Sequence, residues 1–187
     1  MKELSPPAPR MQLHTRQVVC MGWEREDGLF DIEGRLSDVR ARDQDGARGA
    51  TPRKAGEPIH LMSLRLTLDD QFIIVAAEAC THQAPFGDCH EVGELYQRLV
   101  GLPIRAGFQR AVKERFGDAL GCTHLTELLG PLATTAFQTM GPALERRRVA
   151  RGEAMEDPNS MKRLLDTCHG LRRGGQPAII RWGEPAR

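Results

Sequence analysis

The chain has 187 residues, with 26 Lys and Arg against 25 Asp and Glu, so its formal net charge is only +1. A chain of this length can bury enough apolar surface to fold without disulfides or a structural metal, and its balanced charge offers no footprint for nucleic acid or an anionic membrane. No apolar run approaches the roughly 18 residues that a membrane helix needs. We therefore expect a cytoplasmic protein whose five cysteines are thiols, metal ligands or core residues rather than disulfides.

The first half of the chain is predicted to form strands. Residues 1–10 are rich in proline and are expected to be disordered, and residues 11–187 are expected to form a single domain. Apolar and β-branched residues favour strands over residues 13–23 and 29–40. Residues 41–56 are charged and contain almost nothing apolar, which predicts an exposed and mobile loop.

A second pair of strands follows this loop. Residues 61–68 (LMSLRLTL) alternate between apolar and polar side chains, which is the period of a strand buried on one face. Residues 72–79 (FIIVAAEA) are an apolar run typical of a buried partner strand, and Asp69-Asp70 supplies the turn. The face of the first strand that should be buried consists of Met62, Leu64, Leu66 and Leu68.

The hydrophobic period changes to that of a helix in the second half of the chain. Helices are predicted over residues 91–100 and 105–116, and a longer helix begins at Cys122. Pro131 is expected to kink this helix or to split it after Leu129, because proline lacks an N–H and clashes with the preceding turn. Strands first and helices later predict an α+β fold, with three to four helices packed on one face of an antiparallel sheet of three to four strands.

The C-terminal part of the chain carries weaker patterns. A short helix is predicted over residues 146–155, inside an otherwise charged connection. Residues 161–168 are predicted to be helical, and residues 177–182 are predicted to form an edge strand.

Cysteine and histidine cluster along the chain. Four of the five cysteines lie within two residues of a histidine, and the tripeptide Cys-Thr-His occurs twice, at residues 80–82 and 122–124. Thiolate and imidazole are the ligands that zinc and other borderline-soft metals prefer. No pair has the spacing of a zinc finger, and no glycine-rich phosphate loop, nucleophile elbow or HExxH helix is present. The prediction of a metal site therefore depends on the clustering itself.

Cys122 is the strongest single candidate for chemistry. It follows Gly121, opens a predicted helix and has His124 two residues further along. A helix N-terminus carries partial positive charge and free N–H groups, which favour a thiolate as nucleophile or metal ligand. The alternative interpretation is that Cys122 is a small packed residue and that His124 is solvated.

Two further residues complete the predicted ligand set. Cys89 follows a turn and precedes a helix, and His60 stands at the start of the alternating strand. Each has an alternative interpretation without chemistry, because Cys89 could be packed in the core and His60 could lie at the rim of the sheet. The predicted metal ligands are Cys89, Cys122, His124 and His60.

The remaining cysteines are less informative. Cys168 and His169 are additional candidate ligands, although a histidine at the end of a helix also interacts well with the helix dipole. Cys20 lies on a predicted strand and is expected in the core. The sequence does not separate a site role from a loop role for Cys80 and His82.

Five segments spread over nearly the whole chain carry a family resemblance. They are residues 27–34 (DGLFDIEG), 56–62 (GEPIHLM), 84–89 (APFGDC), 121–125 (GCTHL) and 166–170 (DTCHG). Together they resemble an uncharacterised, mainly proteobacterial family named domain of unknown function 2889. This resemblance implies no particular activity.

The order of elements in residues 57–137 carries a second resemblance. His60 leads into a hairpin strand, Cys89 precedes a helix, and Cys122 opens a long helix. This order is similar to that of the iron–sulfur cluster scaffold proteins of the IscU/NifU N-terminal type, and it implies an IscU-like arrangement with these three residues in the ligand loops. The first loop lacks the cysteine of that family, and Asp88 replaces the glycine before the second cysteine. Zinc or a mononuclear iron suits this donor set at least as well as a transferable cluster.

Three functions are compatible with the sequence. The leading hypothesis is a metal-binding accessory or scaffold protein that holds zinc, iron or an iron–sulfur cluster, acts with another protein and has no turnover of its own. The alternative is a cysteine-dependent enzyme in which Cys122 is the nucleophile and His124 or His60 the base, acting on an activated acyl group. The third is an interaction module whose cysteines only pack.

Overall fold

The computed structural model describes residues 4–153 and 164–183. These residues belong to two compact units, the first ending at Met140 and the second beginning at Gly141. The long helix α2 (Thr123–Ala150) starts in the first unit and continues into the second. Within the described ranges, no helix combines the length and the apolar character needed to cross a membrane.

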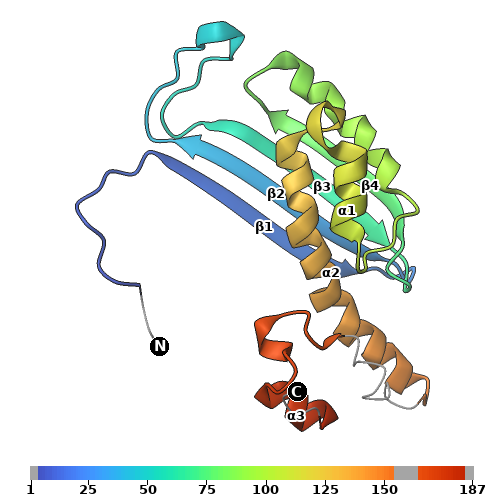
Figure 1. Cartoon of the computed structure of the whole chain (residues 1–187). Helices are drawn as coiled ribbons and strands as arrows, with labels where there is room; N and C mark the ends of the chain where they lie inside the picture. The colour runs from blue at the N-terminus through green and yellow to red at the C-terminus, as the bar shows by residue number, and fades with distance from the viewer. Residues whose placement is uncertain (1–3, 154–163, 184–187) are drawn as a thin grey trace. The chain divides into compact units, whose positions relative to one another are not determined.

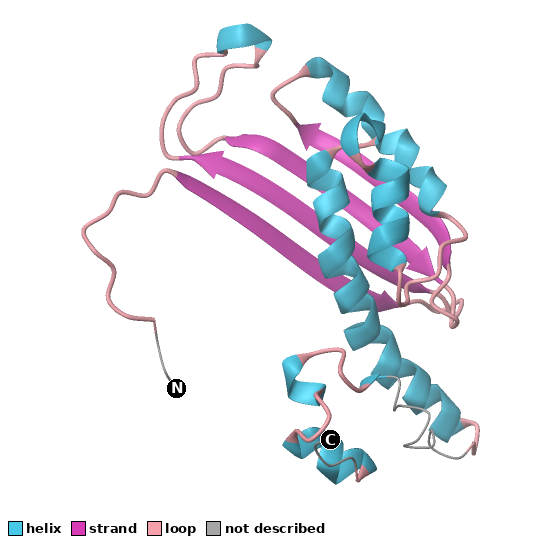
Figure 2. Ribbon diagram, in the orientation of Figure 1, coloured by secondary structure: helices cyan, strands magenta, loops and turns pink. Residues whose placement is uncertain are grey.

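The first unit is built on a four-stranded antiparallel sheet whose strands follow chain order. The strands are β1 (His14–Glu24), β2 (Phe30–Arg40), β3 (Pro58–Leu68) and β4 (Ile74–Gln83). Figure 1 shows the meander, and Figure 2 shows the helices of this unit lying across one face of the sheet. The α+β class and the antiparallel sheet predicted from the sequence are therefore confirmed.

The helix-facing side of the sheet carries the core. The predicted apolar face of β3 is buried, since Met62, Leu64, Leu66 and Leu68 are each at most 1% exposed. Arg65 between them is exposed, so the predicted alternation is confirmed. The start of α2 covers this face with a stripe of buried side chains, namely Leu125, Leu128, Leu129, Leu132 and Ala136.

Two glycines let α2 lie close to the sheet. A Cβ atom at Gly34 on β2 would lie 3.1 Å from Cδ2 of Leu132, and one at Gly22 on β1 would lie 1.9 Å from Oγ1 of Thr139. A side chain at either position would push the helix away from the strands, because packed interiors have almost no spare volume. The two glycines thus help to fix where the beginning of α2 stands above β1 and β2.

Short helices fill the connection between β4 and α2. They are η2 (Gly87–Leu99), α1 (Phe108–Phe116) and η3 (Asp118–Leu120). The helix predicted over residues 91–100 is observed as part of the 3-10 helix η2, and the one predicted over residues 105–116 is observed as α1. Tyr96 of η2 stacks on Phe116 of α1 with ring centroids 4.6 Å apart, which joins the two elements.

The prediction that Pro131 splits the helix after Leu129 is wrong. α2 runs without interruption from Thr123 to Ala150. Proline removes one backbone N–H from the helix, but packing of the apolar stripe against the sheet stabilises the helix on both sides of this position. Hydroxyl groups of Thr134 and Thr135 also donate hydrogen bonds to the carbonyls of Gly130 and Pro131, one turn earlier in the helix.

The second unit differs from the sequence prediction at its end. Residues 177–182, predicted as an edge strand, lie in the helix α3 (Gln176–Trp182). Proline near the first position of the helix and Gly183 in the left-handed conformation after it (φ 62°) are start and stop signals that outweigh the β-branched pair between them. The helix predicted over residues 146–155 is the end of α2 as far as Ala150. Of the helix predicted over residues 161–168, residues 161–163 lie outside the described ranges, and residues 165–168 form turns and bends instead of a helix.

Candidate functional site

A buried carboxylate lies at the centre of the candidate site. Asp38 is 1% exposed and continues the inward-facing alternation of β2 after the buried Leu36. Its partner across β1 is Arg16 and its partner across β3 is His60. Because residues that pair across strands share a face of the sheet, these three side chains project from neighbouring strands toward the same helix-facing side.

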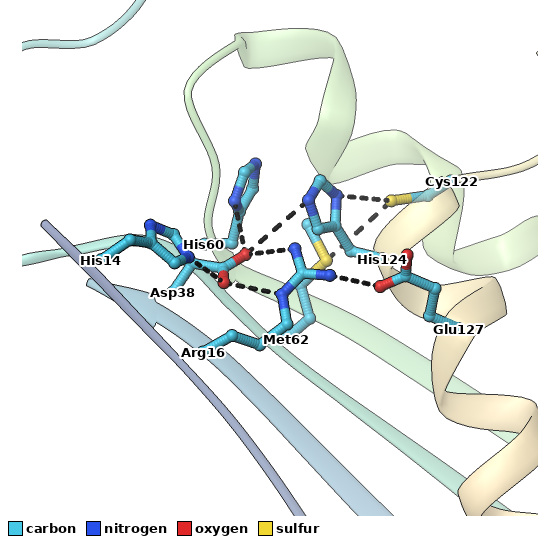
Figure 3. A network of polar contacts seen from close by, with 8 residues as sticks. All are labelled: His14, Arg16, Asp38, His60, Met62, Cys122, His124 and Glu127. Carbon is cyan, nitrogen blue, oxygen red and sulfur yellow. Dashed lines mark hydrogen bonds and ion pairs between the residues drawn. The ribbon is translucent and has the colours of Figure 1, made fainter. Parts of the chain in front are cut away.

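Both oxygens of Asp38 accept hydrogen bonds from these strands. Arg16 donates from Nε to Oδ1 over 2.8 Å and from Nη2 to Oδ2 over 2.7 Å, a bidentate pair. His14 Nε2 lies 2.9 Å from Oδ1, and His60 Nδ1 lies 3.0 Å from Oδ2. Figure 3 shows the carboxylate enclosed by these groups. Burial alone would raise the pKa of Asp38, but the hydrogen bonds from Arg16 and His14 outweigh it and hold this pKa well below its usual range.

The third histidine near Asp38, His124, comes from the first turn of α2. His124 Nε2 lies 3.7 Å from Oδ2 of Asp38, and its ring lies 3.7 Å from the ring of His60, centroid to centroid, at an angle of 30°. Burial, followed by the effect of His124, lowers the pKa of His60, and burial together with Arg16 lowers the pKa of His124. Both imidazoles are therefore neutral near pH 7, the form in which histidine binds metals.

The ligand atoms of Asp38, His60 and His124 all lie within 4.8 Å of one another. In the part of the chain that the structure describes, no other three His, Cys, Asp or Glu side chains lie close enough together to hold one ion. Arg16 also pairs with Glu127, one turn after His124 on α2. Two carboxylates thus outnumber one guanidinium, and the site is net negative when its imidazoles are neutral.

Cys122 lies beside this group rather than in it. Its sulfur is 3.9 Å from Nδ1 of His124, the ring nitrogen that does not face Asp38, and 3.9 Å from the sulfur of Met62. Figure 3 shows His124 between Cys122 on one side and Asp38 on the other. Cys122 is half-buried. One histidine therefore contacts both a thiol and a buried carboxylate.

Tyr96 holds the backbone of Cys122. Its hydroxyl oxygen accepts a hydrogen bond from the Cys122 N–H over 3.1 Å, and it lies 2.9 Å from the Cys122 carbonyl and 2.7 Å from Oγ1 of Thr126. Burial raises the pKa of Tyr96, so the phenol stays protonated and keeps its donor. Because this tyrosine is fully buried and stacked on Phe116, the start of α2 is fixed relative to η2.

The structure brings together only part of the predicted ligand set. His60 and His124 face one another, and Cys122 borders His124, whereas Cys89 is not a member of the group of donor atoms around Asp38. Burial raises the pKa of the Cys89 thiol, and Cys122 adds to this effect. Cys168 and His169 belong to the second unit, at the 3-10 turn η5 (His169–Leu171).

The sequence argument did not find the acidic and basic members of the site. They are Asp38, His14, Arg16 and Glu127. A signal for Asp38 was present, because the inward positions of β2 read Phe30, Ile32, Gly34 and Leu36 before a carboxylate takes the next one. A charged residue in a buried alternation is uncommon unless it is paired.

Residues 14–138 match the family DUF2889, which is described as a protein of unknown function. The chain belongs to this family. The matched span begins at His14 and includes every residue of the site around Asp38. No curated protein and no solved structure matches the chain. The family prediction is thus confirmed, while the resemblance to iron–sulfur scaffold proteins receives no support from these comparisons.

Proposed function

We propose that this DUF2889 domain binds one divalent transition-metal ion, zinc or iron(II), through Asp38, His60 and His124, and serves as an accessory or scaffold protein for a protein partner. The observation that carries the proposal is the convergence of one carboxylate and two neutral imidazoles from β2, β3 and α2 on one point. Two histidines and one carboxylate are a recurring ligand set for zinc and for mononuclear iron(II).

The distances fit such an ion. Ligand atoms at about 2.1 Å from a tetrahedral zinc are roughly 3.4 Å from one another. The separations of 3.0 Å from Asp38 Oδ2 to His60 Nδ1 and 3.7 Å from the same oxygen to His124 Nε2 lie on either side of this value. Small rotations of the two rings would therefore be sufficient to enclose the ion.

The hydrogen bonds to Asp38 support a ligand role for one of its oxygens. Oδ2 faces both candidate imidazoles and would bind the ion beside Nη2 of Arg16, whereas Oδ1 keeps its hydrogen bonds from His14 and from Nε of Arg16. Outer partners of this kind fix the orientation of a metal-binding carboxylate. The donor set also favours a mononuclear ion over an iron–sulfur cluster, because clusters are held chiefly by thiolates and Cys122 is the one thiol that borders His124.

The position of Cys122 favours a second candidate function, a cysteine-dependent acyl transfer. His124 contacts the thiol through Nδ1 and faces the carboxylate of Asp38 through Nε2. In this mechanism Nδ1 takes the thiol proton, the sulfur attacks the carbonyl carbon of a thioester, and the leaving thiolate receives the proton from the imidazolium. Water then hydrolyses the acyl-cysteine and regenerates the thiol.

Metal analysis of protein purified without chelator tests the first proposal against the second. We expect close to one zinc or iron per chain in the parent and in Cys122→Ser, and a loss of that metal in His60→Gln and in His124→Gln. His82 lies on the opposite face of the sheet, so His82→Gln is the matched control and should keep the metal. Metal-free protein after growth with added zinc or iron, or equal metal in all variants, would overturn the proposed site.

A further inference from the structure

A second thiol–imidazole pair lies on the other face of the sheet. Cys80 on β4 pairs directly with Ser63 on β3, and both alternate with the inward-facing residues of their strands. His82 follows two residues later on β4, so it projects from the same face as Cys80. This face is the one opposite to the helices, and both Cys80 and His82 are exposed there.

Contacts join these three side chains in a row. The sulfur of Cys80 lies 3.6 Å from Nδ1 of His82, and Nε2 of His82 lies 3.1 Å from Oγ of Ser63. A neutral imidazole carries one proton, so when Nε2–H donates to the Ser63 hydroxyl, Nδ1 is left as an acceptor that faces the thiol. The Ser63 hydroxyl can accept this bond, and His82 in that form can take a proton from Cys80.

The same tripeptide makes the same contact at the site around Asp38. In Cys122-Thr123-His124 the sulfur also faces Nδ1 of its histidine, at 3.9 Å, and the other nitrogen faces Asp38. The two copies differ in access, since Cys80 is exposed and Cys122 is half-buried. Access and a neighbouring proton acceptor are the two conditions that make a thiol reactive.

The other cysteines lack one condition or both. Cys20 and Cys89 are half-buried, and burial raises the pKa of each thiol. Cys168 is exposed, but among the described residues no imidazole is hydrogen-bonded to its sulfur. Cys80 therefore combines exposure with an imidazole contact, which none of the other four does.

We propose that Cys80 is a modification site for small oxidants of the peroxide class, with His82 as its base and Ser63 as the residue that orients His82. His82 Nδ1 takes the thiol proton, and the sulfur attacks one peroxide oxygen. The O–O bond breaks, sulfur is oxidised to a sulfenic acid, and the departing oxygen takes the proton from the imidazolium and leaves as water or an alcohol. A small external thiol condenses with the sulfenic acid, releases water and forms a mixed disulfide, which a second thiol reduces.

The test measures the rate of modification at each cysteine of the full chain, using hydrogen peroxide followed by a sulfenic-acid probe and, separately, a small neutral alkylating agent. Peptide mass spectrometry after cleavage at acidic residues separates Cys80 from Cys89, because Asp88 lies between them. We expect Cys80 to react at least about tenfold faster than Cys168, the control, which is also exposed. His82→Gln should reduce the rate at Cys80 to that of Cys168, and Ser63→Ala should reduce it partly.

The controls distinguish this proposal from the functions proposed above. His82 is exposed, so His82→Gln should leave the unfolding transition and the metal content unchanged. The rate at Cys168 in the same digest reports any general change in exposure. Equal rates at Cys80 and Cys168, or a rate at Cys80 that is unchanged in His82→Gln, would overturn the proposal. A fast Cys122 beside a slow Cys80 would also overturn it and would favour the acyl-transfer function.

Discussion

Replacing Asp38 by asparagine tests whether the buried carboxylate organises the three strands and α2. The amide keeps an oxygen that can accept from Arg16 Nε and His14 at Oδ1, but it places an N–H group where Oδ2 stood. That N–H faces Nη2 of Arg16, which is itself only a donor, and Nδ1 of His60. One charge-assisted hydrogen bond is lost and a second is weakened.

The expected cost follows from these contacts. A hydrogen bond to a charged group contributes about 1.5–3 kcal/mol. The Arg16 side chain is 37% exposed, so water can partly replace its lost partner, and the lower part of that range applies. We therefore expect Asp38→Asn to lower the free energy of unfolding by about 2 kcal/mol near pH 7.

Urea denaturation in EDTA measures this difference without a contribution from bound metal. Fluorescence of Trp23 on β1 reports the first unit when Trp182 is replaced by phenylalanine in all proteins compared. Asp31→Asn is the matched control, because Asp31 lies on the same strand but its short hydrogen bond comes from a neutral group, the hydroxyl of Thr67. Its contact with the charged Arg25 is longer, at 3.4 Å. Its cost should stay below about 1 kcal/mol.

The pH dependence of Asp38→Asn gives a second readout. The native pKa of Asp38 is held below the ordinary value of about 3.9, so the carboxylate stabilises the fold fully above that value and loses this effect as the pH falls toward the native pKa. The difference between parent and variant should therefore shrink below about pH 4. A difference at pH 7 no larger than that of Asp31→Asn, or one that grows on acidification below pH 4, would refute the reasoning.

Three further substitutions have defined expectations, each measured by urea unfolding. Tyr96→Phe removes the hydroxyl that accepts from the Cys122 N–H and should lower the free energy of unfolding by about 1–3 kcal/mol; an unchanged value would show that water replaces this contact. Gly22→Ala places a Cβ 1.9 Å from Oγ1 of Thr139 and should cost about 1–3 kcal/mol, with Gly87→Ala, at a glycine with open space around it and no positive φ, as the comparison without a clash. Cys122→Ser should stay within about 1 kcal/mol of the parent and keep the metal, whereas joint loss of metal and stability would make Cys122 a ligand.

The strands could be predicted from the sequence because each carries a short-range signal. The alternation in residues 61–68 indicates the buried face of β3 directly, and the observed strand Pro58–Leu68 contains it. The helices could be predicted less well, because their ends and their type depend on tertiary packing. Pro131 is tolerated inside α2 for this reason, and residues 177–182 form a helix because Gly183 and the proline near its start outweigh β-propensity.

The site could be predicted only in part, because pairing between strands is not visible in the local sequence. His60 and His124 were identified from their residue type and their place at the start of an element. Arg16 and Asp38 become neighbours through the pairing of β1 with β2, and 22 positions separate them in the chain. The clustering of cysteine with histidine pointed to Cys89, but the donor atom that lies close to both His60 and His124 belongs to the carboxylate of Asp38.

A crystal structure of the protein grown with zinc, with an anomalous difference map recorded at the zinc absorption edge, tests the central claim most directly. The account predicts one strong peak bonded to Oδ2 of Asp38, Nδ1 of His60 and Nε2 of His124, at about 2.0–2.2 Å from each atom. Cys122 should remain beside His124 without a bond to the ion. A peak bonded to the sulfur atoms of Cys89 and Cys122 instead, or an Asp38 that keeps all its present hydrogen bonds with no zinc beside it, would contradict the account.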